Sequence, residues 1–248
     1  MNDDLILEKQ AREFRSTNGY NDSNCIRLQS LLSALTVITI FKPLGEGFSG
    51  MAVKVGEGED TKRFILINSN HAIGKQHFTI CHELYHLYIQ QNFSSMVCTA
   101  GKFDSKGGEE FKADVFAAYL LLPEAGVKAL IPNEELGLNK ITLKTILKIE
   151  QYFSCSRRAL LYRLKQLGII NGKHYDLFTV NIRKGAWEHG YNTALYKDGN
   201  QGVVIGDYGS LAKELFDTEK ISEAHYHSLL QDLGQDIKEI EGIENDEA

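Results

Sequence analysis

The sequence lacks the features that mark secreted and membrane-spanning proteins. Its 248 residues include only four cysteines, and no two of them form a C-x-x-C pair. Small secreted frameworks are far denser in cysteine, so we expect free thiols in a reducing compartment. The first residues carry no basic segment followed by an apolar core, and no run approaches the roughly 20 apolar residues of a membrane helix. We therefore expect a soluble, cytoplasmic protein with no membrane partner.

Positive charge is also scarce. The chain has 27 lysines and arginines against 33 acidic residues, a net charge of −6, which argues against a protein bound along its whole surface to nucleic acid. No phosphate-cradling G-x-x-x-x-G-K-[ST] motif and no internal repeat is present. A chain of this length buries about 70–75% of its unfolded surface and needs no metal to stay folded. A metal site here would therefore serve chemistry.

Hydrophobic periodicity divides the chain into helical and β-rich stretches. The β-rich runs at 37–41, 50–55 and 63–67 are separated by glycine-rich turns and predict a small sheet of about three strands with antiparallel neighbours. Further strands are expected at 175–180, 193–196 and 203–205. An acidic tail, expected to be disordered, closes the chain. Helices are predicted at about 3–17, 26–35, 76–90, 109–122, 142–152, 156–167 and 221–233.

The strongest chemical signal is an H-E-x-x-H motif at 82–86. On a helix, His82 and His86 are about 40° apart on one face, so both imidazoles can reach one ion at the roughly 2.0–2.1 Å that zinc requires. Glu83 lies about 100° from His82, beside the metal, where it can take a proton from an attacking water. The alternative is a polar stripe on a surface helix. The apolar neighbours of the motif argue against it, because a mostly buried helix must give these side chains partners.

A third ligand is expected from the next helix. Glu110 and Asp114 are four residues apart and share a face with small alanines, which lets this helix approach the first. Glu110 is then a natural ligand, and Asp114 a natural acceptor for a histidine N–H group. The alternative is a solvated first turn whose acids favour the helix dipole, and Glu109 is the other candidate ligand.

Together these motifs resemble the ImmA/IrrE family of metallo-endopeptidases. The segment FTICHELYH at 78–86 is followed at 110–123 by E-x-x-A-D-x-F-A-A-x-L-L-L-P, and the similarity covers roughly residues 25–170. The resemblance implies a gluzincin-like site with one catalytic Zn²⁺ held by His82, His86 and Glu110. It implies Glu83 as general base and a helix-turn-helix repressor as substrate. Tyr85 stands where the family usually has glycine, so its ring is expected to line or narrow the cleft.

An oxyanion donor is expected outside the motif, and the sequence does not choose among His71, His77 and Tyr119. For each of them a packing or surface role is the stronger interpretation. Cys81 adjoins His82, which raises a weaker hypothesis of sensing by oxidation. Manganese could replace zinc in the cell.

A basic stretch follows the metal motifs. Two helices meet at a Ser-Cys-Ser link with Ser156 as N-cap, which resembles a helix-turn-helix and places Arg157 and Arg158 where recognition residues sit. The favoured alternative is a helical support that packs on the rest of the protein or docks a partner. The stretch contains one acid, Glu150, and seven basic residues: Lys140, Lys144, Lys148, Arg157, Arg158, Arg163 and Lys165.

These observations predict an α+β protein. A zincin-like domain with its N-terminal helix spans 1–135, a helix-turn-helix-like pair spans 136–170, and a small C-terminal α/β segment with the acidic tail spans 171–248. The predicted function is a zinc-dependent endopeptidase that cleaves a regulatory protein. The alternatives are a catalytically silent docking module and a DNA-binding regulator, with DNA the less favoured partner. A silent scaffold would have no chemical need for Glu83.

Overall fold

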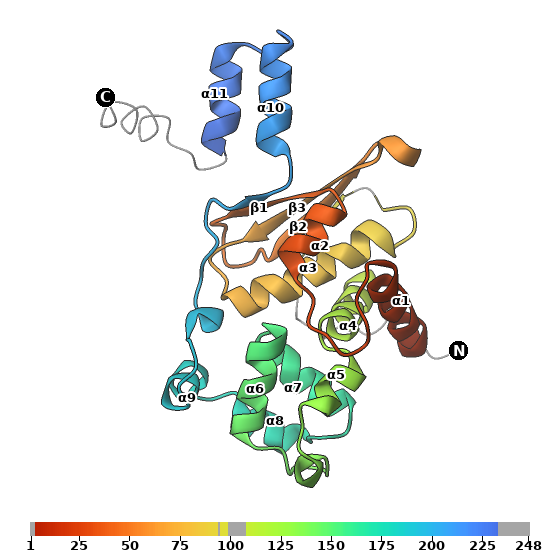
Figure 1. Cartoon of the computed structure of the whole chain (residues 1–248), viewed down its shortest axis with the longest axis vertical. Coiled ribbons are helices and arrows are strands. Elements are labelled where there is room, and N and C mark those ends of the chain that lie inside the picture. Colours follow the sequence, from red (N-terminus) through yellow and green to blue (C-terminus); the bar gives the residue numbers. More distant parts are fainter. Residues whose placement is uncertain (1–2, 94, 99–107, 233–248) are drawn as a thin grey trace.

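The computed structural model describes residues 3–93, 95–98 and 108–232. A mixed sheet and three long helices form one part, a group of shorter helices lies beside it, and a helical hairpin projects from the opposite side of the sheet (Figure 1). The protein is therefore α+β, as predicted. Among the described residues no helix is both long and apolar enough to cross a membrane.

The sheet contains the three predicted strands and two short additional ones. Its order is β4-β2-β3-β1-β5. The expectation of antiparallel neighbours holds for β2 with β3 but is wrong for β1 with β3, which pair in parallel. The reason is that β3 returns from β2 through a six-residue connection that contains a short 3-10 turn, and it inserts between β2 and β1. The strands are β1 (Val37–Lys42), β2 (Gly50–Val55), β3 (Lys62–Asn68), β4 (Ser95–Cys98) and β5 (Val204–Ile205).

Four helices pack with the sheet in this part, and each lies where the sequence predicts a helix. α3 packs against β2 and β3, α4 packs on α3, and α1 packs on α4. The buried guanidinium of Arg15 joins these layers, because its Nη1 donates to the carbonyl of Leu120 at 2.6 Å and its Nε to that of Asn21 at 2.9 Å. The helices are α1 (Asp3–Thr17), α2 (Leu28–Ala34), α3 (Ile73–Tyr88) and α4 (Glu109–Leu121).

Short helices make up the second part. The predicted N-cap at Ser156 is confirmed, since its hydroxyl accepts from the Ala159 N–H, and Thr142 caps the preceding helix in the same way. The helices are α5 (Glu124–Ala129), α6 (Leu143–Phe153), α7 (Arg157–Gln166), α8 (Gly172–Phe178) and α9 (Ile182–Glu188). Short 3-10 turns occupy Gly58–Asp60, Asn133–Glu135 and Ala194–Tyr196.

Two of the strands expected late in the chain are wrong. Residues 175–180 fall mostly within α8, because Asn171 caps that helix and Tyr175 and Phe178, three residues apart, both pack against the core. A spacing of three residues places both side chains on one face of a helix. Residues 193–196 form a 3-10 turn that starts where the Asn192 side chain accepts from the Ala194 N–H. The third expected strand is present as β5.

The C-terminal segment returns to the sheet and to α3. β5 pairs with β1, and the Ile73 N–H at the start of α3 donates to the carbonyl of Lys197 at 2.8 Å. Gln76 donates to the carbonyl of Gly199 and accepts from Asn200, both at 2.9 Å. The hairpin α10 (Tyr208–Asp217) and α11 (Glu223–Asp232) follows. The predicted domain boundaries stay predictions, and the acidic tail lies outside the described residues.

Candidate metal centre

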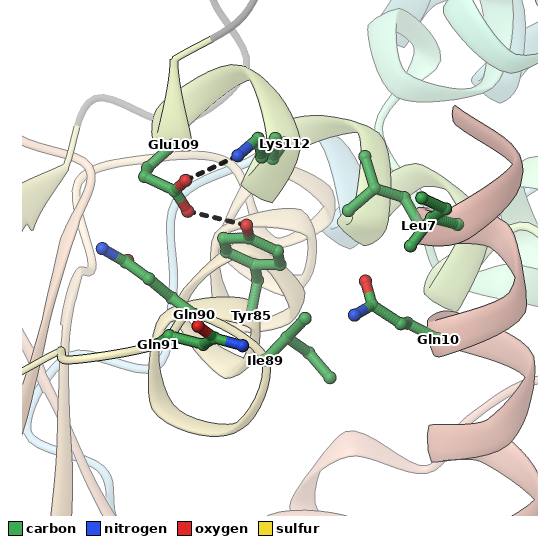
Figure 2. A pocket seen from close by; sticks show the side chains of 9 residues that line it. Leu7, Gln10, Tyr85, Ile89, Gln90, Gln91, Glu109 and Lys112 are labelled. Carbon is green, nitrogen blue, oxygen red and sulfur yellow. Dashed lines mark hydrogen bonds and ion pairs between the residues drawn. The ribbon is translucent and has the colours of Figure 1, made fainter. Parts of the chain in front are cut away.

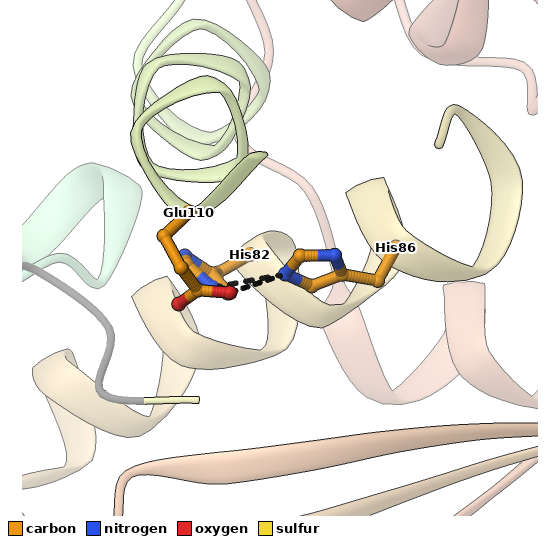
Figure 3. A group of neighbouring side chains, drawn as sticks. All are labelled: His82, His86 and Glu110. Carbon is orange, nitrogen blue, oxygen red and sulfur yellow. Dashed lines mark hydrogen bonds and ion pairs between the residues drawn. The ribbon is translucent and has the colours of Figure 1, made fainter. Parts of the chain in front are cut away.

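Two buried histidines and a glutamate converge between α3 and α4 (Figure 3). The Nε2 atoms of His82 and His86 lie 3.2 Å apart. The Glu110 carboxylate, from the first turn of α4, lies 3.4 Å from His82 Nε2 and 3.3 Å from His86 Nε2. One ligand atom from each residue lies within 4.8 Å of the others, and the Glu110 side chain is 39% exposed, so the cluster is open on that side. This donor set suits zinc with one open position.

Hydrogen bonds behind the rings determine which nitrogen faces the cluster. His82 Nδ1 lies 2.8 Å from Asp114 Oδ1, and His86 Nδ1 lies 2.5 Å from Gln90 Oε1. If each Nδ1–H donates outward, both Nε2 atoms carry bare lone pairs that point at one another and at a carboxylate. Three acceptors that converge in this way repel unless a cation lies among them. The residues present therefore fit a divalent metal.

The carboxyl of Glu110 is held in its ionised form. In the metal-free cluster burial acts to raise the pKa of Glu110, but hydrogen bonds and charge interactions with the protonated forms of His82 and His86 outweigh burial and hold this pKa well below its usual range. An ionised carboxylate is the form that binds a metal.

Glu83 is fully buried on the face of α3 that meets β2. A Cβ atom at Gly50 on β2 would lie 2.7 Å from Glu83 Oε1 and 2.6 Å from Thr79 Cγ2. Only glycine lets the strand approach the helix this closely, so Gly50 makes the space that the Glu83 carboxylate fills. A glycine inside a strand is a signal of close backbone approach, but the sequence does not say to which residue.

Tyr85 turns toward a hollow near the end of α3 (Figure 2). Its hydroxyl donates to Glu109 Oε2 at 2.7 Å, and Lys112 donates to Glu109 Oε1 at 2.7 Å. Burial raises the pKa of Tyr85, and the neighbouring Glu109 raises it further. The other candidate ligand, Glu109, is thus bonded to Tyr85 and Lys112. The hollow measures about 380 Å³ and is lined by Ile6, Leu7, Gln10, Tyr85, Ile89, Gln90, Gln91, Glu109 and Lys112.

The three candidate oxyanion donors each have structural contacts. His71 Nε2 lies 3.1 Å from Lys75 Nζ, and His77 Nδ1 lies 2.7 Å from the Ser154 carbonyl oxygen. The Tyr119 ring packs under a guanidinium group, 4.4 Å from its centroid. These contacts favour the packing roles over an oxyanion role.

The thiol of Cys81 is fully buried, and burial raises its pKa to about 12. A thiol in this state is poorly nucleophilic and slow to oxidise. The environment of Cys81 therefore gives no support to the oxidation-sensing hypothesis.

Two of the seven basic residues between 140 and 165 are buried, and both are arginines. Arg157 pairs with the buried Glu150 and also donates to the carbonyl of Phe178 at 2.9 Å. The buried Arg163 donates from Nε to the carbonyl of Leu122 at 3.1 Å. Arg158 remains exposed. The helix pair is thus fastened by its own arginines, which favours the supporting role.

Comparison with known proteins gives one finding. The family model described as Peptidase_M78, IrrE N-terminal-like domain, matches residues 39–165, slightly more than half of the 248 residues. The matched region contains most of β1, all of β2 to β4, the three converging side chains, α6 and nearly all of α7. The comparison with curated proteins finds no match.

Proposed function

Since the chain belongs to the Peptidase_M78 family of the IrrE N-terminal-like domain, we propose that it is a zinc-dependent endopeptidase that cleaves a helix-turn-helix transcriptional repressor. A metallopeptidase-like function follows from the family itself. The zinc dependence is supported by the donor set of the cluster, and the repressor as substrate by the resemblance to ImmA/IrrE endopeptidases. We place the activity in the cytoplasm, because the described Cys25, Cys81 and Cys155 are free thiols.

The observation that carries the proposal is the convergence of His82, His86 and Glu110, with ligand atoms within 4.8 Å of one another. Each histidine is oriented from behind by an acceptor, so the lone pairs are aimed before any metal arrives. A structural zinc site would close all four positions with protein ligands, whereas three ligands leave room for a reacting group.

The residues have distinct roles in the proposed mechanism. His82, His86 and Glu110 hold the metal, which when bound polarises a carbonyl and lowers the pKa of a water to about 7. Glu83 takes the proton of the attacking water and delivers it to the leaving amine. Asp114 holds His82 in the tautomer whose Nε2 faces the cluster.

A catalytically silent docking module is the alternative of a different class. Such a module needs no carboxylate at position 83. Yet a side chain at Gly50 on β2 would collide with Glu83, so the strand has a glycine where it meets this carboxylate. The burial of Arg157 and Arg163 removes two of the charges that a DNA-binding regulator would use. We further propose that residues 1–135 form the catalytic part, that 136–170 support it, and that 171–248 regulate it.

The first test is the metal content of the purified protein, measured by elemental analysis on wild type and Glu110→Ala. We expect about one zinc per chain in wild type and much weaker binding in the variant. Cleavage of a helix-turn-helix repressor encoded beside this protein is then compared between wild type and Glu83→Gln. Cleavage that survives in Glu83→Gln would refute the assignment of Glu83 as general base. Absence of bound metal after reconstitution would refute the proposal that the protein is a metallopeptidase.

A further inference from the structure

The surroundings of His86 differ from those of His82. Phe93 stacks on the His86 ring at 5.3 Å with planes 25° apart, and Tyr85 meets it edge-on at 5.5 Å. These aromatic contacts define the plane of the ring but do not distinguish its two orientations related by a 180° flip about the Cβ–Cγ bond, which exchanges ring nitrogens with ring carbons. The hydrogen bond from Nδ1 to Gln90 Oε1, at 2.5 Å, supplies the missing constraint.

Gln90 lies two residues beyond the last residue of α3, where its backbone N–H donates to the Tyr85 carbonyl at 2.9 Å. Its side chain is half-buried and lines the hollow of about 380 Å³ (Figure 2). The amide oxygen of Gln90 lies beside Nδ1 of the His86 imidazole, whereas Nε2 of the same ring faces His82 and Glu110.

The geometry points to Gln90 as a positioning residue that holds His86 for the metal. Its amide oxygen accepts the Nδ1–H, which selects the tautomer with a bare Nε2 and turns that nitrogen toward His82 and Glu110. This inference rests on the proposed metal function and adds a residue that neither motif contains.

The two histidines are thus oriented by acceptors of unequal strength. Asp114 offers His82 a charged carboxylate, whereas Gln90 offers His86 a neutral amide. A charge-assisted hydrogen bond is roughly twice as strong as a neutral one and makes the imidazole a more basic ligand. His86 is therefore the less strongly supported of the two ligands, and its bond to the metal depends on Gln90 for direction.

The test compares zinc affinity, measured by competition with a chromophoric chelator, in wild type, Gln90→Leu, Gln90→Glu and Gln91→Leu. Gln91→Leu is the matched control, because Gln91 lines the same hollow and is its sequence neighbour. Thermal unfolding of the metal-free proteins and the visible spectrum of the Co²⁺ forms are recorded in parallel.

We expect Gln90→Leu to lose about 10–100-fold in zinc affinity and to alter the Co²⁺ spectrum, while its metal-free unfolding temperature matches that of Gln91→Leu. Gln90→Glu should retain or exceed the wild-type affinity, because a carboxylate accepts the same N–H. Equal zinc affinity in Gln90→Leu and Gln91→Leu overturns the inference while the metal centre stands. A metal-free unfolding temperature that is lower in Gln90→Leu than in Gln91→Leu also overturns the inference, since that difference marks a structural role. A wild type that binds no zinc overturns both proposals.

Discussion

Replacing Gly50 with alanine would insert a methyl carbon where β2 crosses α3. Its ideal position lies 2.6 Å from Thr79 Cγ2, 2.7 Å from Glu83 Oε1 and 3.2 Å from the carbonyl oxygen of Leu66. Two of these separations are shorter than any ordinary carbon contact, and both partners belong to a helix that is buried between the sheet and α4. The strand and the helix must therefore move apart, or Glu83 must leave its position.

Overpacking of a well-packed core costs about 1–3 kcal/mol, and alanine recovers about 0.4–1 kcal/mol by restricting the unfolded chain. The central values leave a net loss of about 1 kcal/mol for Gly50→Ala, which lowers the unfolding temperature of a protein of this size by about 2–4 °C. Thermal unfolding followed by circular dichroism measures this change. If the wild type cleaves the repressor, Gly50→Ala should cleave it more slowly, because the added methyl group displaces Glu83, the proposed base.

The double variant Gly50→Ala/Thr79→Ser separates the two contacts. Serine lacks Cγ2, so it relieves the 2.6 Å contact and should recover part of the stability, whereas the contact with Glu83 and the loss of cleavage remain. Unfolding of Gly50→Ala at the wild-type temperature would refute the reasoning, because it would mean that β2 and α3 do not approach as closely as described.

Three further changes test other parts of the structure. Arg157→Met leaves the buried carboxylate of Glu150 with the Tyr196 hydroxyl but without its ion-pair partner, and should cost about 3–5 kcal/mol. The substitution Arg158→Ala, at an exposed position, should change stability by less than about 0.5 kcal/mol in a chemical denaturation curve. Asp114→Ala should lose about 10–100-fold in zinc affinity measured by chelator competition, and an unchanged affinity would exclude its orienting role. Burial lowers the pKa of His77, so its neutral form contributes stability above the unfolded pKa of about 6.5 and loses it as the pH falls. The unfolding temperature should therefore drop between pH 7 and 5 more steeply in wild type than in His77→Gln, and parallel profiles would contradict this.

The sequence predicts the first half of the fold well for a physical reason. In α1 the buried Leu7, Ala11 and Phe14 recur at the helical period, so pattern and packing agree. α3 and α4 are buried on nearly all sides, and their length and the proline that ends α4 mark them instead. The segment after residue 170 has weaker patterns. The short β-rich run at 175–180 predicts a strand by composition, but the cap at Asn171 and the contacts of α8 with α7 decide for a helix. The parallel pairing of β1 with β3 depends on which strand inserts between which, and no local signal carries that.

The candidate site divides in the same way. His82, Glu83 and His86 are adjacent on one helix, so their spacing alone brings them together, and Glu110 with Asp114 repeats that logic on α4. The sequence does not single out Gln90, although it stands four residues after His86, because no sequence pattern says which side chain bonds to Nδ1 of His86. The role of Gly50 depends on contact between segments about 30 residues apart, which only the folded chain defines.

The centre is therefore governed by one interface, the packing of α4 on α3. α3 carries both histidines, while α4 carries Glu110 and, one turn later, Asp114, which reaches behind His82. A single register between the two helices thus fixes the proposed ligand and the proposed orienting residue together, and a slip of one turn would lose both. The fully buried Ala113 and Ala117 lie on α4 at positions where larger side chains would hold the helices apart. The small residues let α4 approach α3, and the acidic pair then reaches the histidines. Motifs on both helices therefore specify the candidate metal site more strongly than the histidines alone.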